Sequence, residues 1–99
     1  MDITPEQVSI VQQILKKNLP QNTKVWIFGS RAIKAKKEFS DLDLAVDASE
    51  ILPLSVMSSL EYAFSESDLP YKVDIVDLNN TSENFRDEIR AEWILFWKS

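Results

Sequence analysis

The sequence contains no histidine and no cysteine, and these two absences restrict its chemistry. Without cysteine there is no disulfide and no thiolate nucleophile. Without histidine the commonest general base near neutral pH is missing, together with the Ser-His-Asp and Cys-His nucleophile systems. A tight zinc site is not expected without either residue. Any enzymatic chemistry must therefore use carboxylates, hydroxyls, lysine, arginine and a hard, oxygen-liganded ion such as Mg²⁺.

The sequence also lacks long apolar runs and a surplus of positive charge. It has no stretch of about 18 apolar residues and no signal peptide, so we expect a cytoplasmic protein without a membrane segment. The net charge of -5 argues against direct nucleic-acid binding, because no general surplus of cations is available to neutralise phosphates. With 99 residues, of which 44% are apolar, the chain is expected to form a single domain over residues 1–99.

Glycine occurs once, at Gly29, directly after an apolar strand predicted from Lys24 to Phe28. The simplest interpretation of a Gly-Ser pair is a plain turn between a strand and a helix. However, Ser30 and Arg31 would open a short helix whose first N–H groups attract anions. Four of the eleven basic residues also lie within residues 31–37. We therefore interpret Gly29, Ser30 and Arg31 as candidate phosphate-binding residues.

Acidic residues at alternate positions follow this turn. Across residues 41–47, Leu42, Leu44 and Val46 alternate with Asp41, Asp43, Ala45 and Asp47, so a strand would place Asp41 and Asp43 on one face. Two carboxylates side by side repel each other unless a cation lies between them. Asp74 interrupts another apolar strand, predicted from Tyr71 to Leu78, where an unpaired carboxylate is costly. If the two strands are neighbours, Asp74 joins the other two acids, whereas Asp77 has the opposite parity and is the weaker candidate.

The rest of the chain reads as packing elements around this site. A first helix is predicted to begin at Thr4 and to stop at Pro20, and a second to run from about Leu52 to Ser67. A third would open in a capping box at Asn80 to Glu83 and carry Phe85, Ile89 and Trp93 on one face. The apolar tail from Trp93 to Trp97 either folds back onto the sheet or forms an aromatic-rich partner interface.

Three ordered blocks of the sequence resemble the signature of the minimal nucleotidyltransferase (MNT) family, small members of the DNA polymerase β-like superfamily. The blocks are Phe28-Gly29-Ser30-Arg31-Ala32, Ser40-Asp41-Leu42-Asp43-Leu44 and Val73-Asp74-Ile75-Val76. The resemblance covers nearly the whole chain. It implies an α/β (α+β) fold of the polymerase β-like nucleotidyltransferase type, a small mixed sheet flanked by helices.

The resemblance also implies an activity and a partner. Asp41 and Asp43 would bind two Mg²⁺ ions, and Asp74 would bind the ion on the nucleophile side and help to deprotonate the attacking hydroxyl. Gly29 and Ser30 would hold the β- and γ-phosphates of ATP, and Arg31 would add positive charge. Family members pair with a helical HEPN-family protein encoded by the adjacent gene. In several pairs that protein is a toxic RNase, and the MNT protein is an antitoxin that transfers AMP to its tyrosine.

One position departs from the family pattern and leaves alternatives open. Lys34 stands where family members usually carry a second glycine. A catalytically weak or inactive antitoxin that acts by complex formation is therefore one alternative. A small-molecule nucleotidyltransferase with a separate substrate-binding subunit is another, but the sequence shows no acceptor pocket for it.

Overall fold

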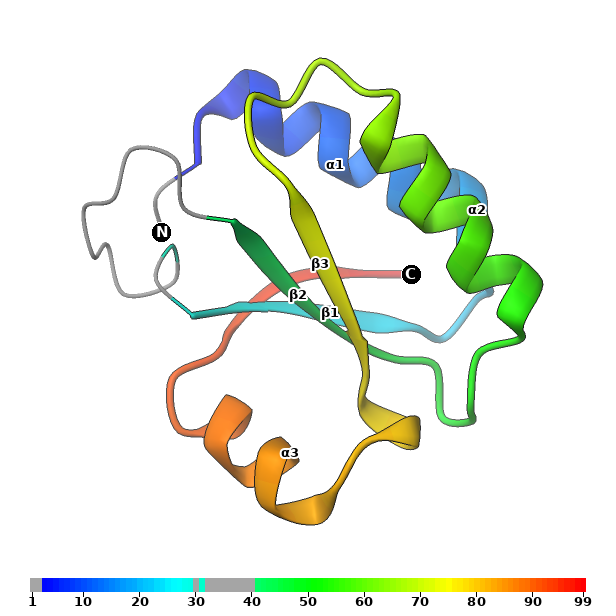
Figure 1. Ribbon diagram of the computed structural model, residues 1–99, viewed down its shortest axis with the longest axis vertical. Helices are drawn as coiled ribbons and strands as arrows, with labels where there is room; N and C mark the ends of the chain where they lie inside the picture. Colours follow the sequence, from blue (N-terminus) through cyan, green and yellow to red (C-terminus); the bar gives the residue numbers. More distant parts are fainter. Residues whose placement is uncertain (1–2, 30, 32–40) are drawn as a thin grey trace.

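The chain folds into a mixed four-stranded sheet with helices on both faces (Figure 1). The computed structural model describes residues 3–29, 31 and 41–99. The sheet has the order β3-β2-β1-β4; β2 and β3 are parallel, and the other two pairs are antiparallel. In chain order the elements are α1 (Pro5–Asn18), β1 (Lys24–Phe28), β2 (Leu42–Asp47), α2 (Leu54–Ser65), β3 (Val73–Asp77), the 3-10 turn η1 (Leu78–Asn80), α3 (Glu83–Arg90) and β4 (Ile94–Lys98). This architecture confirms the predicted fold class.

The first helix begins as its sequence predicts. The Thr4 hydroxyl accepts a hydrogen bond from the Gln7 backbone N–H at 3.2 Å, and the Gln7 side chain accepts one from the Thr4 N–H at the same distance. This reciprocal capping box fixes the start of α1, and Pro5 occupies the first turn, where its missing N–H costs nothing. Val11 and Leu15 of α1 are fully buried against the sheet.

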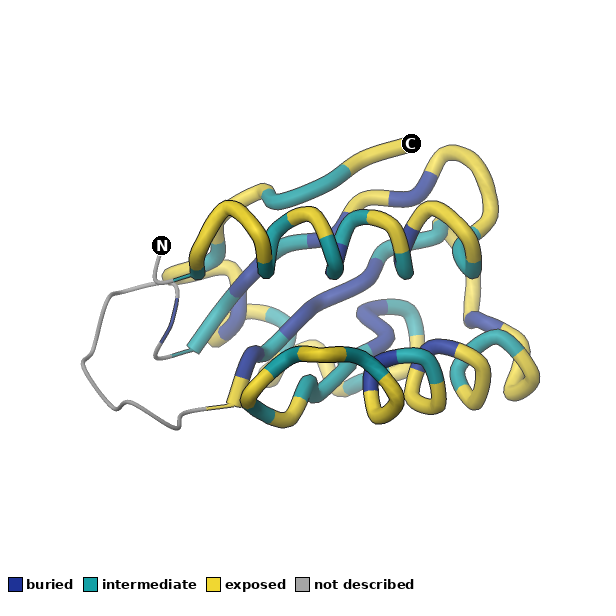
Figure 2. Tube along the Cα trace, turned by 90° about the horizontal axis from the view of Figure 1, so that it is seen from above, coloured by how far each residue is buried: buried dark blue, intermediate teal, exposed yellow. Residues whose placement is uncertain are grey.

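Alternation along the strands divides the interior into two cores. Figure 2 shows buried positions on the strands and at intervals along the helices. One face of the sheet packs against α1 and α2, and its buried side chains are Val11, Leu15, Val25, Ile27, Leu42, Leu44, Val46, Leu52, Leu60 and Phe64. The opposite face packs against η1 and α3 through a smaller cluster, Ala45, Leu78 and Ile89, joined by Trp26, Phe28, Val76 and Trp93. Odd and even positions of β1 thus face different helices, as the two-residue period of a strand requires.

The end of the chain differs from the predicted helix. We expected Trp93 to continue the helical face of Phe85 and Ile89, but α3 ends at Arg90. The Glu92 N–H donates to the Ile89 carbonyl at 3.2 Å, which tightens the last turn and redirects the chain. The Trp93 ring then stacks on Trp26, with ring centroids 4.1 Å apart and planes 7° apart.

The apolar tail folds back onto the sheet, the first of the two alternatives considered for it. Ile94–Lys98 forms β4, an edge strand antiparallel to β1. The start of α3 also differs from the prediction. The Ser82 hydroxyl, and no group of Asn80, accepts the Phe85 N–H at 3.1 Å, because Asn80 already belongs to the 3-10 turn η1.

The second helix and the third strand are shorter than predicted. α2 begins at Leu54, because the Leu52 N–H donates to the Asp77 carboxylate at 2.8 Å and Pro53 precedes the first turn. β3 ends at Asp77, and η1 begins at the next residue, Leu78. Within the described part of the chain, no helix has the length and apolar character needed to cross a lipid bilayer.

Candidate active site

The site is a row of side chains that crosses three strands on the face covered by α3. Asp43 of β2 is the register partner of Phe28 in β1 and of Asp74 in β3. Directly opposed residues of neighbouring strands project to the same face of a sheet. The structure therefore brings Asp43 and Asp74 together, and the Phe28 ring lies beside Asp43 on the other side. Strand parity brings Asp74 beside Asp43 only if their strands are neighbours, and the parallel pairing of β2 with β3 meets this condition.

Asp41 stands at the edge of this row. It directly precedes β2, which begins at Leu42, where the pairing of β2 with Val73 of β3 begins. Its side chain is exposed, yet its charge still acts on Asp43. The expectation that Asp41 opens the strand is thus wrong by one residue, although the two acids remain within electrostatic reach of each other.

Asp43 is held in an unfavourable environment for a carboxylate. Burial raises the pKa of Asp43 from 3.8 to about 6, with further contributions from the negative charges of Asp74 and Asp41. Among the described residues, no ion pair links Asp43 to a cation that would offset these effects. A cation placed near this carboxylate would therefore be stabilised.

Gly29 allows the chain to turn directly beside Asp43. Its φ is +77°, a left-handed conformation that residues with a Cβ rarely adopt. A Cβ at this position would also collide with Oδ2 of Asp43. Conformation and space thus both require glycine here, and the turn after β1 and the carboxylate of β2 are in direct contact.

A family model described as "Polymerase beta, Nucleotidyltransferase" matches residues 10–99. The chain belongs to this nucleotidyltransferase family. It is 45% identical over 95 residues to the "Probable protein adenylyltransferase MntA" of Haemophilus influenzae, an alignment that covers 96% of this chain and 82% of the relative. The predicted family resemblance and the prediction of a nucleotidyltransferase are therefore confirmed.

Solved structures show the same fold. A toxin-antitoxin complex crystallised with AMP-PNP contains a chain that matches this nucleotidyltransferase with a TM-score of 0.79 and 25% identity, over 93% of this chain and 73% of that one. The MNT antitoxin in complex with a tri-AMPylated HEPN toxin from Shewanella oneidensis matches with a TM-score of 0.70 and 24% identity, over 93% and 70% of the two chains. The second likeness shows the fold alone.

Of the two candidate phosphate-binding residues Ser30 and Arg31, the structure describes only Arg31. Arg31 is only 6% exposed, and its guanidinium carbon lies 3.7 Å from the centre of the Tyr71 ring. The Tyr71 hydroxyl in turn donates to the Gln7 side chain at 2.9 Å. Arg31 is thus oriented by a ring from the segment that leads into β3. Ser30 and Lys34 lie outside the described residues.

The magnesium ions implied by the family resemblance require hard oxygen ligands, and the site residues supply them. Asp43 and Asp74 are in direct register, and the negative charges of Asp74 and Asp41 add to burial in raising the pKa of Asp43. The donor chemistry therefore fits Mg²⁺. Across residues 3–29, 31 and 41–99, however, no three acidic side chains are already gathered as a metal site. Asp41 is exposed and lies one position before β2, and it does not form a gathered metal site with Asp43 and Asp74.

Two neighbours of the site were missed by the sequence analysis. The Lys72 ammonium lies 3.4 Å from Oδ1 of Asp74. Its position two residues before Asp74 in the predicted strand from Tyr71 to Leu78 was a usable signal, because residues at that spacing on a strand share a face. Tyr71 beneath Arg31 gave no such signal, since 40 residues separate the two in sequence. Asp77, the weaker candidate, is buried and accepts the Leu52 N–H, so its role in the fold is structural.

Proposed function

We propose that this nucleotidyltransferase transfers AMP from ATP to a hydroxyl group in a Mg²⁺-dependent reaction. The acceptor is a tyrosine of a HEPN-family protein encoded by the adjacent gene, and the pair acts as a cytoplasmic toxin-antitoxin system. The observation that carries the proposal is the carboxylate pair of Asp43 and Asp74 in direct register, with the Gly29 turn against Asp43.

Each site residue has a defined part in this reaction. Asp41, Asp43 and Asp74 would hold two Mg²⁺ ions, which when bound neutralise charge on the attacking and leaving oxygens. Asp74 accepts the proton of the attacking hydroxyl, whose oxygen forms the bond to the α-phosphorus. The bond to the β-phosphate breaks, and pyrophosphate leaves. Gly29 and Ser30 hold the β- and γ-phosphates with backbone N–H groups and a hydroxyl, and Arg31 adds positive charge.

The similar proteins support the nucleotide and the partner. The 45% identical relative carries the name of a probable protein adenylyltransferase. The similar toxin-antitoxin complex was crystallised with AMP-PNP, an analogue of ATP. A HEPN toxin accompanies the MNT antitoxin of Shewanella oneidensis, which has the same fold.

The test of this proposal is transfer of labelled AMP. The protein is incubated with ATP labelled at the α-phosphate, Mg²⁺ and the HEPN-family protein encoded by the neighbouring gene. We expect label on that protein with the wild type, and none with the double variant Asp41→Ala, Asp43→Ala. Asp87→Ala, which removes an exposed carboxylate of α3, is the matched control and is expected to behave as the wild type. Absence of label with the wild type, or undiminished label with the double variant, refutes the proposal.

A second function is favoured by the spread of the carboxylates. Because the described residues contain no gathered group of three acids, an antitoxin that acts by complex formation alone remains the alternative. This alternative predicts no label transfer by the wild type. It also predicts that the double variant still binds the partner and suppresses its toxicity.

A further inference from the structure

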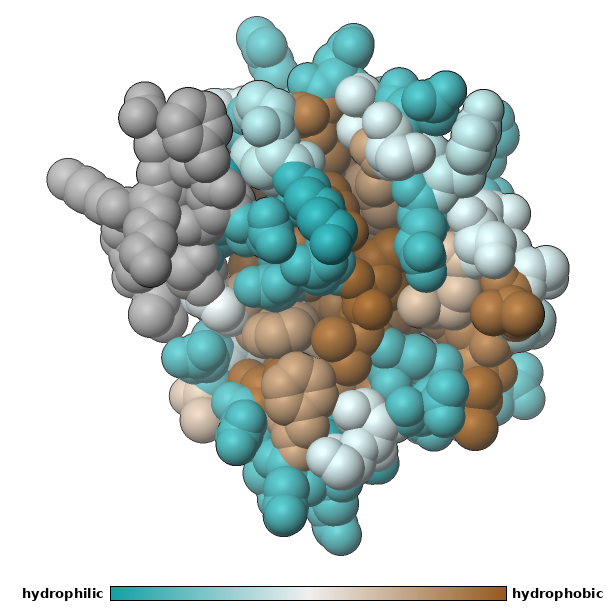
Figure 3. Space-filling model, in the orientation of Figure 1, coloured by the Kyte–Doolittle hydropathy of each residue, from teal (hydrophilic) through white to brown (hydrophobic). Residues whose placement is uncertain are grey.

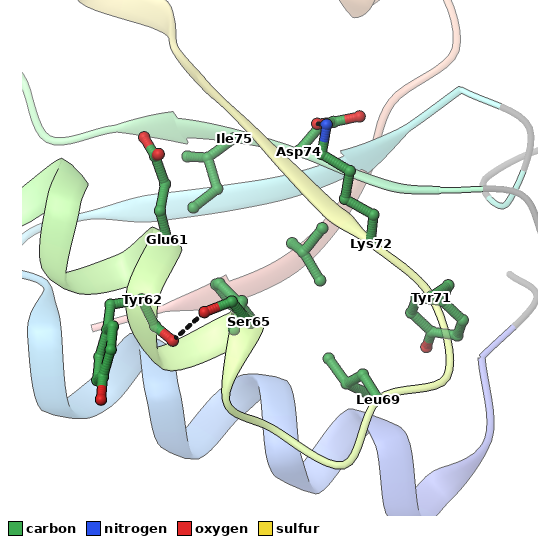
Figure 4. A pocket seen from close by; sticks show the side chains of 10 residues that line it. Glu61, Tyr62, Ser65, Leu69, Tyr71, Lys72, Asp74 and Ile75 are labelled. Carbon is green, nitrogen blue, oxygen red and sulfur yellow. Dashed lines mark hydrogen bonds and ion pairs between the residues drawn. The ribbon is translucent and has the colours of Figure 1, made fainter.

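A cavity extends from the candidate active site along the outer edge of β3 (Figure 4). It has a volume of about 740 Å³ and lies between the last turns of α2, the connection 66–72 and β3. Ser65 of α2 lines one side, and Asp74 lines the other together with its ion-pair partner Lys72. Figure 3 shows apolar surface along β3 between α2 and α3, framed by hydrophilic side chains. No acceptor pocket was predicted from the sequence, yet one of the candidate catalytic carboxylates, Asp74, lines this cavity.

The wall of the cavity formed by β3 presents backbone hydrogen-bonding groups. β3 is an edge strand, with β2 as its neighbour in the sheet. The Lys72 carbonyl accepts the Leu42 N–H at 2.9 Å and therefore points toward β2. Because backbone groups of successive strand residues point to opposite sides, those of Val73 and Ile75 point outward. Both residues line the cavity.

An edge of this kind recognises an extended polypeptide. Outward N–H and C=O groups at alternate residues are the template on which another chain adds a strand. The second edge of the sheet, β4, also has unpaired backbone on its outer side, but it carries no candidate catalytic carboxylate. The β3 edge is therefore where strand addition and chemistry coincide.

We propose that the acceptor segment of the partner polypeptide binds in this cavity as an extended strand paired with β3. The inference rests on the proposed function and specifies its acceptor site. Side chains of the added strand alternate between the two faces of the sheet. The residue that bears the acceptor hydroxyl lies on the Asp74 face, and its two neighbours in sequence point toward α2. The required partner chemistry is thus a non-helical segment with a hydroxyl-bearing residue between side chains that fit beside Ser65.

The first test measures amide hydrogen exchange in the full chain, with and without the HEPN-family protein of the neighbouring gene. We expect exchange at Val73 and Ile75 to slow by at least about tenfold in the complex, because an added strand protects outward N–H groups. Ser59, an exposed residue of α2 outside the cavity wall, serves as the reference amide and is expected to be unchanged. Unchanged exchange at both Val73 and Ile75 on partner binding overturns the inference, as does the absence of any binding.

The second test obstructs the cavity. Ser65→Trp places a large ring in it, and Ser59→Trp is the same change on the same helix outside it. For Ser65→Trp we expect the KM for the partner to rise by about tenfold or more, with the KM for ATP unchanged. Ser59→Trp should match the wild type. Equal KM values for the partner in the two variants overturn the inference.

The design separates this inference from the proposed function. If the wild type transfers no AMP, the proposed function fails, but the partner's Kd is still measured by titration against wild type, Ser65→Trp and Ser59→Trp. If only Ser65→Trp binds the partner more weakly, the result supports binding of the partner segment in the cavity. Equal Kd values for all three proteins overturn it. The inference of a polypeptide acceptor is also overturned if the wild type transfers AMP to a small hydroxylated compound and not to the partner, and if Ser65→Trp blocks that transfer.

Discussion

Replacing Asp43 with asparagine is expected to stabilise the metal-free protein at neutral pH. Burial and the charges of Asp74 and Asp41 raise the pKa of Asp43 from 3.8 to about 6. One pKa unit corresponds to about 1.4 kcal/mol, so a shift of about two units sets an upper bound near 3 kcal/mol. Solvent screening of this partly exposed group reduces the expected gain to about 1 to 2 kcal/mol. For a domain of this size, the melting temperature would rise by about 4 to 8 °C per kcal/mol.

The pH dependence of this gain has a definite sign. The folded state holds the proton of Asp43 more tightly than the unfolded state, so stability falls as the pH rises from 3.8 to about 6 and the penalty is complete above that range. Thermal unfolding of wild type and Asp43→Asn in EDTA, from pH 3.5 to 8, measures the difference. The curves should converge at the acid end and separate toward neutral pH.

Asp47 provides a contrasting control on the same strand. A hydrogen bond from the Asn79 side chain lowers the pKa of Asp47, with the Ser49 N–H and the charges of Lys24 and Arg86 acting in the same direction. Its stabilising contribution is present above pH 3.8 and is lost as the pH falls through its lowered pKa. Asp47→Asn should therefore destabilise the protein at neutral pH. An Asp43→Asn variant that is no more stable than wild type in EDTA at pH 7.5 refutes the electrostatic argument.

Three further substitutions test other parts of the structure. Gly29→Ala should lower AMP transfer by about 100-fold, because its Cβ displaces the Asp43 carboxylate. The positive φ should cost only about 1 to 2 kcal/mol of stability, so transfer kinetics and urea unfolding of this variant separate the loss of activity from the loss of stability. Asp77→Ala should cost about 1 to 3 kcal/mol in urea unfolding, since the buried Leu52 N–H loses its acceptor, and Asp77→Asn, which keeps an acceptor oxygen, should lose less. Trp93→Ala should cost about 2 to 4 kcal/mol by removing one ring of the stacked indole pair, with Trp93→Phe intermediate in urea midpoint.

Local signals in the sequence were sufficient for the elements around the site. The apolar run from Lys24 to Phe28 ends at the only glycine, and β1 has these same bounds. Thr4 and Gln7 form the predicted capping box, because its geometry involves only neighbouring residues. Strand parity placed Asp74 on the opposite face of its strand from Val73 and Ile75, but its position beside Asp43 also required β3 to lie next to β2.

The sequence could not provide the features that depend on strand order. Trp93 continues the helical spacing of Phe85 and Ile89, yet stacking on Trp26 requires the chain to turn back. Periodicity alone could not distinguish these outcomes. The contact between Arg31 and Tyr71 joins segments far apart in sequence. The cavity beside β3 exists because β3 is an edge strand, and no local sequence pattern specifies which strand of a sheet is outermost.

The central claim is that the carboxylates beside the Gly29 turn catalyse transfer of AMP to the partner protein. The most direct measurement is label transfer from α-labelled ATP to the HEPN-family protein of the neighbouring gene in the presence of Mg²⁺, with the wild type and the Asp41→Ala, Asp43→Ala variant compared at equal partner occupancy. The account predicts labelled partner with the wild type and none with the double variant. Equal labelling by both proteins, or no labelling by the wild type while it binds the partner, would contradict it.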